Sequence, residues 1–133
     1  MTRSRVYGKT MPSILIIDDD DSLRDGLHRT LRKEGYTIME ASGGGGGLKQ
    51  LERSPVDLVL LDMFMPDKDG LETIRELRRT HPGIRIIAMS GGGFKGTVDV
   101  LHVAELLGAR RTLAKPFTRE ELLDAVHETL VEA

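Results

Sequence analysis

The 133-residue chain contains no cysteine. This absence excludes disulfide bonds, thiolate metal sites and a cysteine nucleophile, and it fits a reducing compartment. Long apolar runs are missing as well: no stretch approaches the roughly 18 residues of a membrane span, and the amino terminus lacks the apolar middle of a secretory signal. From these absences we expect a cytoplasmic protein that does not associate with a membrane.

An excess of positive charge is also absent. The formal net charge is −2, and Arg3, Arg5 and Lys9 lie in the first nine residues, which leaves 16 basic and 21 acidic residues in the rest of the chain. Such an acidic body argues against nonspecific nucleic-acid binding, and we expect no direct contact with DNA. A chain of this length forms one domain. We therefore expect a flexible tail over residues 1–12 and a single domain over residues 13–131.

Short apolar runs alternate with helical patterns along the chain. The uninterrupted runs Ile14–Ile17, Leu58–Leu61 and Ile84–Met89 are typical of strands buried on both faces, and weaker strands fit Tyr36–Glu40 and Arg111–Ala114. Between them, apolar residues recur at spacings of three and four, which indicates helices. The pattern predicts an α/β fold: a flavodoxin-like, doubly wound parallel sheet of five strands in order 2-1-3-4-5, with five helices.

Polar residues and glycines mark the helix boundaries. Ser22 and Asp25 can open the first helix, and Thr118 with Glu121 forms a capping box for the last. Five consecutive glycines, 43–47, occupy the expected start of the second helix. Because each interior glycine costs about 1 kcal/mol, we predict that this helix begins only near Leu48.

Polar residues of different kinds follow the strands. Asp18 and Asp19 come directly after the first strand, Asp62 ends the third, Ser90 the fourth and Lys115 the fifth. Because the carboxyl ends of parallel strands share one edge, we expect these side chains to converge. Two unit charges about 4 Å apart repel by roughly 4 kcal/mol at an effective dielectric of 20. The three carboxylates therefore predict a hard divalent cation, Mg²⁺ or alternatively Mn²⁺.

The charges of this cluster suit phosphoryl transfer. Three carboxylates, one ammonium and one divalent ion sum to zero, which leaves the site ready for a phosphoryl anion. The Ser90 hydroxyl can donate a hydrogen bond to that anion. An ionised aspartate is a competent nucleophile toward phosphorus when metal and lysine neutralise the transferring group, and the product is an acyl phosphate. The residues thus predict phosphoryl transfer to the protein itself.

Three segments of the chain resemble the signatures of response regulator receiver domains. They are ILIIDDDDSLR from Ile14, LLDMFMPDKDG from Leu60 and LAKPF from Leu113, in the order and register of that family. The resemblance covers Ser13–Val131. It implies a cis bond between the lysine and proline of the third segment.

The resemblance also implies a role for each residue of the cluster. The metal ligands would be Asp18, Asp19, Asp62 and the backbone carbonyl of Phe64. The catalytic residues would be the phosphoacceptor Asp62, the sensing hydroxyl of Ser90 and the pairing ammonium of Lys115. Such a protein is a switch that assists its own phosphorylation and dephosphorylation, and it is not an enzyme with an external substrate.

The implied partners belong to two-component and phosphorelay signalling. A sensor histidine kinase or a histidine phosphotransfer protein would donate the phosphoryl group, and the output would pass through contacts with a downstream protein that the sequence does not identify. A shuttle or sink in a phosphorelay and a freely diffusing regulator are both compatible with the chain. Homodimer formation is left open.

Two positions depart from the family pattern. Family members often carry an aromatic switch residue three positions before the lysine, where this chain has Thr112, so a ring flip there cannot report phosphorylation. Phe64, two positions after the acceptor, is bulky. We hypothesise that its ring screens the acyl phosphate from water and lengthens its lifetime.

Other interpretations of the motifs are weaker. Residues 91–96 fit GxGxxG, but a dinucleotide-binding loop normally follows the first strand and has an acid about 20 residues further on. A magnesium phosphohydrolase that forms an aspartyl phosphate usually has a second acid two residues after its nucleophile, where this chain has Phe64. An adaptor that keeps the fold without the chemistry would not need the intact acidic and lysine residues.

Overall fold

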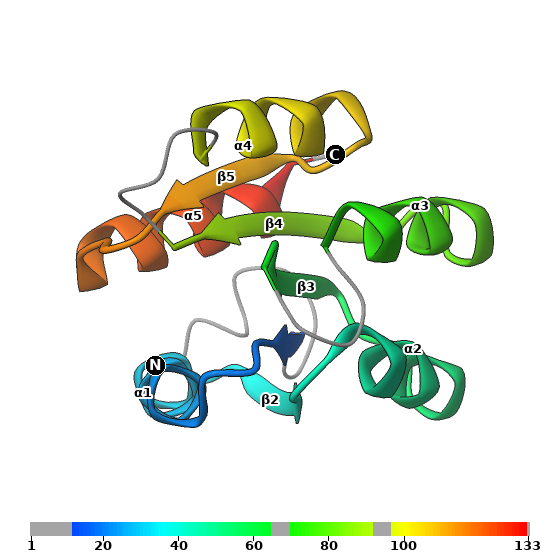
Figure 1. Cartoon of the computed structure of the whole chain (residues 1–133). Coiled ribbons are helices and arrows are strands. Elements are labelled where there is room, and N and C mark those ends of the chain that lie inside the picture. Colours follow the sequence, from blue (N-terminus) through cyan, green and yellow to red (C-terminus); the bar gives the residue numbers. More distant parts are fainter. Residues whose placement is uncertain (1–11, 65–69, 92–96, 133) are drawn as a thin grey trace.

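Strands and helices alternate throughout the chain (Figure 1). The structure, a computed structural model, describes residues 12–64, 70–91 and 97–132, with the side chains of 97–99 left aside. In order, the elements are β1 (Ser13–Ile17), α1 (Asp21–Lys33), β2 (Thr37–Ala41), α2 (Gly44–Arg53), β3 (Leu58–Asp62), α3 (Gly70–Thr80), β4 (Arg85–Ser90), α4 (Thr97–Leu106), β5 (Arg111–Ala114) and α5 (Arg119–Val131).

The strands form one parallel sheet in the order β2-β1-β3-β4-β5. The predicted fold class, strand order and five helices are therefore confirmed. Each strand boundary lies within one residue of its predicted position, and the strands extend to include polar residues such as Asp62, which pairs with Met89. The predicted tail lies almost wholly outside the described residues, as does most of the glycine-rich segment after Ser90, so the tail and its boundary stay predictions.

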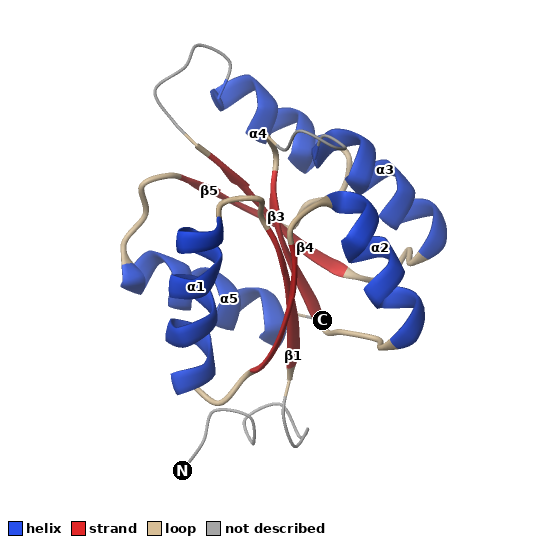
Figure 2. Ribbon diagram, turned by 60° about the horizontal axis from the view of Figure 1, so that its bottom comes forward, coloured by secondary structure: helices blue, strands red, loops and turns tan. Residues whose placement is uncertain are grey.

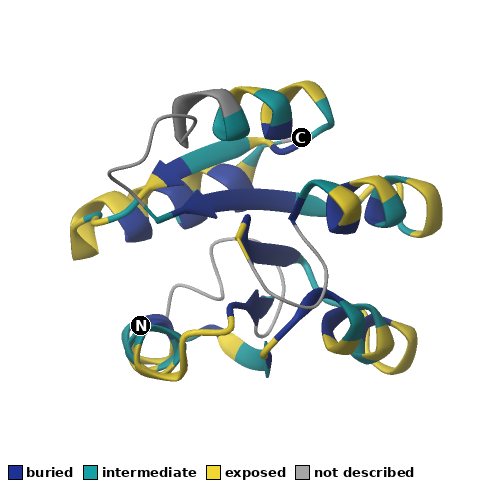
Figure 3. Cartoon of the chain, in the orientation of Figure 1, coloured by how far each residue is buried: buried dark blue, intermediate teal, exposed yellow. Residues whose placement is uncertain are grey.

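Helices cover both faces of the sheet (Figure 2): α1 and α5 lie on one face, and α2, α3 and α4 lie on the other. Because successive side chains of a strand point to opposite faces, β1 contributes Ile14 and Ile16 to the core under α1 and α5, and Leu15 and Ile17 to the other core. All four are fully buried, and each such side chain stabilises the fold by about 1.5–3 kcal/mol. Exposed residues lie on the outer sides of the helices (Figure 3).

The first helix is capped by a residue other than the two predicted. The side chain of Asp20 accepts a hydrogen bond from the backbone N–H of Leu23 at 3.1 Å, and both Ser22 and Asp25 lie inside the helix. Four consecutive aspartates precede Ser22, and the end of β1 decides which of them becomes the cap. The predicted capping box of Thr118 and Glu121 is present at the start of α5.

The second helix begins at Gly44, so the prediction that it begins near Leu48 was wrong. The glycines allow α2 to approach the sheet closely. A Cβ atom added at Gly47 would lie 2.4 Å from Cδ1 of Ile17, which is far inside van der Waals contact. A larger residue there would displace the buried side chain of Ile17, so close packing of α2 on β1 favours glycine and offsets its low helix propensity.

Arginines anchor the end of α5 at the amino edge of the sheet. Arg85, the first residue of β4, donates from Nη2 to the backbone carbonyl of Glu132 at 2.8 Å. Arg111, the first residue of β5, pairs through Nη2 with the carboxylate of Glu132, and its Nε lies 3.4 Å from Oε1 of Glu128. The last turn of α5 therefore lies at the sheet edge opposite to Asp62. Among the described residues, no helix combines the length and apolarity that crossing a membrane requires.

Candidate functional site

The polar residues after the strands meet at the carboxyl edge of the sheet. Backbone hydrogen bonds continue beyond the strand ends and fix this edge. The N–H of Asp18 donates to the carbonyl of Ala41 at 3.1 Å, and the N–H of Lys115 donates to the carbonyl of Ser90 at 2.8 Å. Four neighbouring strands, β1, β3, β4 and β5, thus each hold one part of the cluster in place. The three aspartates and Lys115 lie together as predicted, and Ser90 ends β4 at the same edge, while their roles stay predictions.

Three carboxylates lie together at this edge. Asp18, Asp19 and Asp62 each offer an oxygen, and these three oxygens lie within 4.8 Å of one another. Asp18 is fully buried and Asp62 is 4 % exposed, whereas Asp19 faces solvent. Oδ1 of Asp18 accepts a hydrogen bond from the backbone N–H of Asp20 at 2.9 Å, which fixes its orientation. The cluster is open to solvent on the side of Asp19.

Lys115 supplies the positive charge of the site. Its Nζ lies 3.0 Å from Oδ2 of Asp18 and 3.5 Å from Oδ1 of Asp62, and the side chain is 18 % exposed. The peptide bond between Lys115 and Pro116 is cis, as the sequence resemblance implied. One ammonium therefore lies between two nearly buried carboxylates.

Asp62 is the carboxyl whose protonation this environment changes. Burial raises the pKa of Asp62 from 3.8 to about 6, and the nearby charge of Asp18 adds to the rise. The ammonium of Lys115 acts in the opposite direction, as does the backbone N–H of Phe64, which lies 3.4 Å from Oδ1 of Asp62. The pKa rise means that ionised Asp62 lacks full compensation by its protein neighbours.

The carboxylates fit a small divalent cation. Magnesium binds oxygen at about 2.1 Å, so two ligands on opposite sides of one ion lie about 4.2 Å apart. The oxygens of the three aspartates are within 4.8 Å of one another and match that dimension, with water able to complete the shell. All three are hard oxygen donors, the type that magnesium and manganese prefer. Phe64 follows within two residues of Asp62, and ligation by its carbonyl stays a prediction.

Ser90 brings a free hydroxyl to this edge. It ends β4, next to β3, and is fully buried. Its Oγ has no hydrogen-bond partner among the residues that the structure describes. A buried hydroxyl without a partner carries a desolvation cost of about 1–3 kcal/mol, which a ligand oxygen at this edge would relieve. A phosphoryl oxygen bound at this edge would therefore accept a hydrogen bond from Ser90.

Sequence reasoning missed Arg24, which also touches the cluster. Its Nη1 donates to the backbone carbonyl of Asp18 at 2.7 Å. Arg24 lies near the amino end of α1, where the helix dipole disfavours a cation. That unfavourable placement was the signal in the sequence, because a cation at this position needs a compensating partner.

Comparison with known protein families agrees with this geometry. A family model described as "Response regulator receiver domain" matches residues 14–127. "Sporulation initiation phosphotransferase F" of Bacillus subtilis (strain 168) is 37% identical over 117 residues, which are 88% of this chain and 92% of that protein. "Sensor kinase CckA" of Brucella abortus (strain 2308) is 37% identical over 120 residues, which are 89% of this chain but 12% of that protein.

Solved structures of the same kind superimpose on the chain. The receiver domain of NtrX from Brucella abortus has a TM-score of 0.85 at 26% identity, with 90% of this chain and 99% of that chain covered. A CheY-like response regulator receiver domain protein from Methanospirillum hungatei JF-1 has a TM-score of 0.80 at 30% identity, with 90% and 94% covered.

Proposed function

The chain belongs to the response regulator receiver domain family, and from this premise we propose that it is a magnesium-dependent phosphoacceptor switch. In this role Asp62 accepts a phosphoryl group from a phosphohistidine donor, and the phosphorylated edge signals through protein contacts. One observation carries the proposal: the Lys115 ammonium lies within 3.5 Å of both Asp18 and Asp62, beside a third carboxylate. Charge and geometry there favour a phosphoryl anion held between an ion and a lysine.

The proposed transfer is a single displacement at phosphorus. An ionised oxygen of Asp62 forms the new bond to phosphorus, the bond between phosphorus and the donor imidazole nitrogen breaks, and its electron pair leaves with the imidazole. Lys115 and the Ser90 hydroxyl hold the phosphoryl oxygens as charge develops. Bound at Asp18, Asp19 and Asp62, Mg²⁺ would neutralise the remaining negative charge.

The protonation state of Asp62 allows this chemistry at neutral pH. With a pKa of about 6, Asp62 is mostly ionised at pH 7. Bound magnesium would lower that pKa, because a nearby cation favours the charged form. The nucleophile is therefore available without a separate general base.

Intact-mass measurement tests the proposal. The protein is incubated with acetyl phosphate or phosphoramidate and MgCl₂, and we expect a mass gain of one phosphoryl group. Asp62→Asn should show no gain, and EDTA should abolish the gain in the parent. Asp57→Asn is the control: Asp57 accepts a bond from the backbone N–H of Ser13, away from the cluster, and this variant should be labelled as the parent is. A gain that persists in Asp62→Asn would contradict the proposal.

A groove between α1 and α5 supports docking of the phosphodonor. Two adjoining cavities of about 440 and 260 Å³ share the residues Gly26, Thr30 and Arg119. The smaller cavity also includes Ser22, three positions after Asp19, and Phe117, two positions after Lys115. The groove therefore begins beside the acidic edge and continues along α1.

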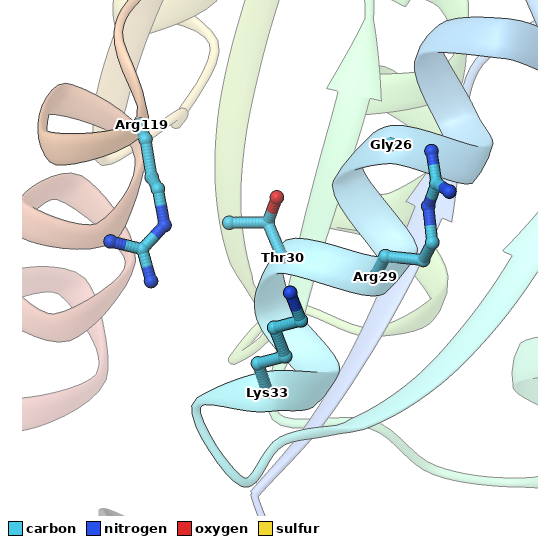
Figure 4. Close-up of a pocket in the computed structure, with 5 residues that line it drawn as sticks. All are labelled: Gly26, Arg29, Thr30, Lys33 and Arg119. Carbon is cyan, nitrogen blue, oxygen red and sulfur yellow. The ribbon is translucent and has the colours of Figure 1, made fainter.

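The lining of the groove changes from apolar to basic along its length. Near the acidic edge it is lined by Leu23, Leu27 and Leu122. Farther along α1 the lining includes Arg29 and Lys33, and Arg119 projects from the start of α5, as Figure 4 shows together with Gly26 and Thr30. Arg29 lies 3.5 Å from Asp25 and Arg119 lies 3.3 Å from Glu34, so two of these cations already have acidic partners. We infer that an elongated segment of the phosphodonor docks here, with apolar side chains near its histidine and an acidic side chain near Lys33.

Gly26 indicates that this groove is kept open. A Cβ atom added at Gly26 would meet nothing within 4 Å, so the packing of the domain does not require glycine there. A glycine in the middle of a helix nevertheless costs about 1 kcal/mol relative to alanine. In the proposed complex, the docked segment of the phosphodonor occupies the space that Gly26 leaves open.

A bulky substitution separates docking from chemistry. In Gly26→Leu, acetyl phosphate should still label Asp62 to the parental extent, because the acidic edge is unchanged. Transfer from a phosphorylated histidine protein that serves the parent should fall by about tenfold, because a contact worth about 1.4 kcal/mol is lost. Gly83→Leu is the matched control. A Cβ there also meets nothing within 4 Å, and Gly83 lies just before the amino end of β4, away from the acidic cluster. Equal transfer to both variants would contradict docking in the groove.

A further inference from the structure

Arg24 connects three segments around the acidic cluster. Its Nη1 donates to the carbonyl of Asp18 at 2.7 Å, its Nε to Oε1 of Glu40 at 3.0 Å and its Nη2 to Oδ1 of Asp21 at 2.6 Å. The side chain is 16 % exposed. Its partners lie after β1, in β2 and at the start of α1, so a single guanidinium joins the loop that carries the aspartates to two neighbouring elements.

The segment bound by Arg24 carries two of the three carboxylates. The backbone N–H of Asp18 continues the ladder to β2, Oδ1 of Asp18 accepts from the N–H of Asp20, and Oδ2 accepts from Lys115. The carbonyl of Asp18 is the remaining polar group, and it belongs to the peptide that leads directly to Asp19. Holding this carbonyl therefore fixes the backbone position from which the exposed side chain of Asp19 extends.

Glu40 in turn holds Arg24. Its Oε1 accepts from Nε of Arg24, its Oε2 pairs with Nδ1 of His28 at 2.5 Å, and its backbone carbonyl accepts from Nε2 of Gln50. The carboxylate of Glu40 is thus held by two side chains of α1, and its backbone is held by Gln50 of α2. Because Arg24 is bound to this carboxylate, its guanidinium cannot swing away from Asp18 without losing a charge-assisted hydrogen bond.

We propose that Arg24 is a positioning residue for the cation site, acting through the carbonyl of Asp18 and held in place by Glu40. The proposal rests on the proposed magnesium-dependent function and extends it to a residue outside the ligand set. Arginine is suited to this role because its planar fork can donate to several acceptors at fixed angles, whereas a lysine ammonium would reach one of them. The expected consequence is a preformed arrangement of Asp18 and Asp19 before the ion arrives.

Direct measurement of Mg²⁺ binding by isothermal titration calorimetry tests this role without any phosphoryl chemistry. For Arg24→Met we expect the Kd for Mg²⁺ to rise by about tenfold, the lower part of the range seen when residues that support metal ligands are removed. Arg24→Lys should lie between this variant and the parent, and Glu40→Gln should also weaken binding. Circular dichroism establishes that each variant is folded during the titration.

Two controls separate positioning from general stability. Arg32→Met removes an exposed cation from the same helix, and Leu130→Ala weakens the core at the far end of α5. Both should bind Mg²⁺ with the parental Kd. If Arg24→Met or, where that variant does not fold, both Arg24→Lys and Glu40→Gln bind within about twofold of the parent, Arg24 has no positioning role. A parent protein that binds no Mg²⁺ would overturn the proposed function and this inference together. If the parent binds Mg²⁺ and the variants bind it equally well, this inference alone fails.

Discussion

Nζ of Lys115 lies 3.0 Å from Oδ2 of Asp18, although 97 positions separate the two residues in the chain. This contact joins the residue after β5 to the residue after β1, across the ends of β3 and β4. The site is therefore complete only when the four strands are paired. A chain with an unpaired β5 has its carboxylates without their ammonium, and the phosphoacceptor edge is a property of the whole sheet.

Removal of the ammonium should destabilise the domain. In Lys115→Met, the carboxylates of Asp18 and Asp62 lose their common partner in a nearly buried setting, and we expect the free energy of unfolding to fall by about 3 kcal/mol at pH 7 in EDTA. Urea unfolding measures this change. Lys49→Met, at an exposed position of α2, should stay within about 0.5 kcal/mol of the parent. Equal losses in the two variants would argue that Lys115 has no compensating role.

Asp62 should make stability depend on pH in a specific direction. Because the pKa of Asp62 is about 6 in the folded protein against 3.8 ordinarily, the folded state binds more protons than the unfolded chain between these values. Stability should therefore fall as pH rises through this window, by about 3 kcal/mol in total.

Asp62→Asn isolates this effect, because it removes the titrating group. The variant should match the parent near pH 4 and exceed its stability at pH 7 when no divalent ion is present. Urea unfolding in EDTA at several pH values measures the difference. Parallel stability profiles for the two proteins would show that Asp62 titrates alike in the folded and unfolded chains.

Phe64 should control how long the phosphoryl group persists. Its side chain is 50 % exposed, and its backbone N–H lies 3.4 Å from Oδ1 of Asp62. We expect Phe64→Ala to dephosphorylate severalfold faster than the parent, because water reaches the acyl phosphate more easily, and Phe64→Leu to lie between them. Decay of the phosphorylated mass after removal of acetyl phosphate gives the rate. Unchanged decay in the alanine variant would end the screening hypothesis.

Two adjacent glycines of α2 should respond oppositely to alanine. At Gly47 the added Cβ would lie 2.4 Å from Cδ1 of Ile17, and overpacking of this kind should destabilise by about 1–3 kcal/mol. At Gly46 the added Cβ would lie 3.8 Å from Cβ of Ala41, an ordinary contact, so the better helix propensity should stabilise by up to about 1 kcal/mol. Thermal unfolding of both variants checks the signs, and a stabilised Gly47→Ala would contradict the close packing of α2.

The fold and the acidic cluster were predictable because each depends on local signals. Continuous apolar runs identify buried parallel strands, and the polar residue after each run lies at the shared edge whatever the details of packing. The start of α2 was not predictable, because it depends on how closely Gly47 approaches Ile17. The cap of α1 was ambiguous among equivalent aspartates. Arg24 and the groove at Gly26 depend on where side chains point in the folded domain, which spacing in the sequence does not contain.

The anchoring of α5 by Arg85 and Arg111 places the end of that helix at the edge opposite to the phosphoacceptor. Val131, in the last turn, is half exposed, and the chain has no cysteine of its own. A single thiol introduced at Val131 would therefore carry a fluorophore or a surface attachment at the pole farthest from the chemistry. Binding of ion, phosphoryl group and donor could then be observed on one tethered molecule without obstruction of the edge at which they meet.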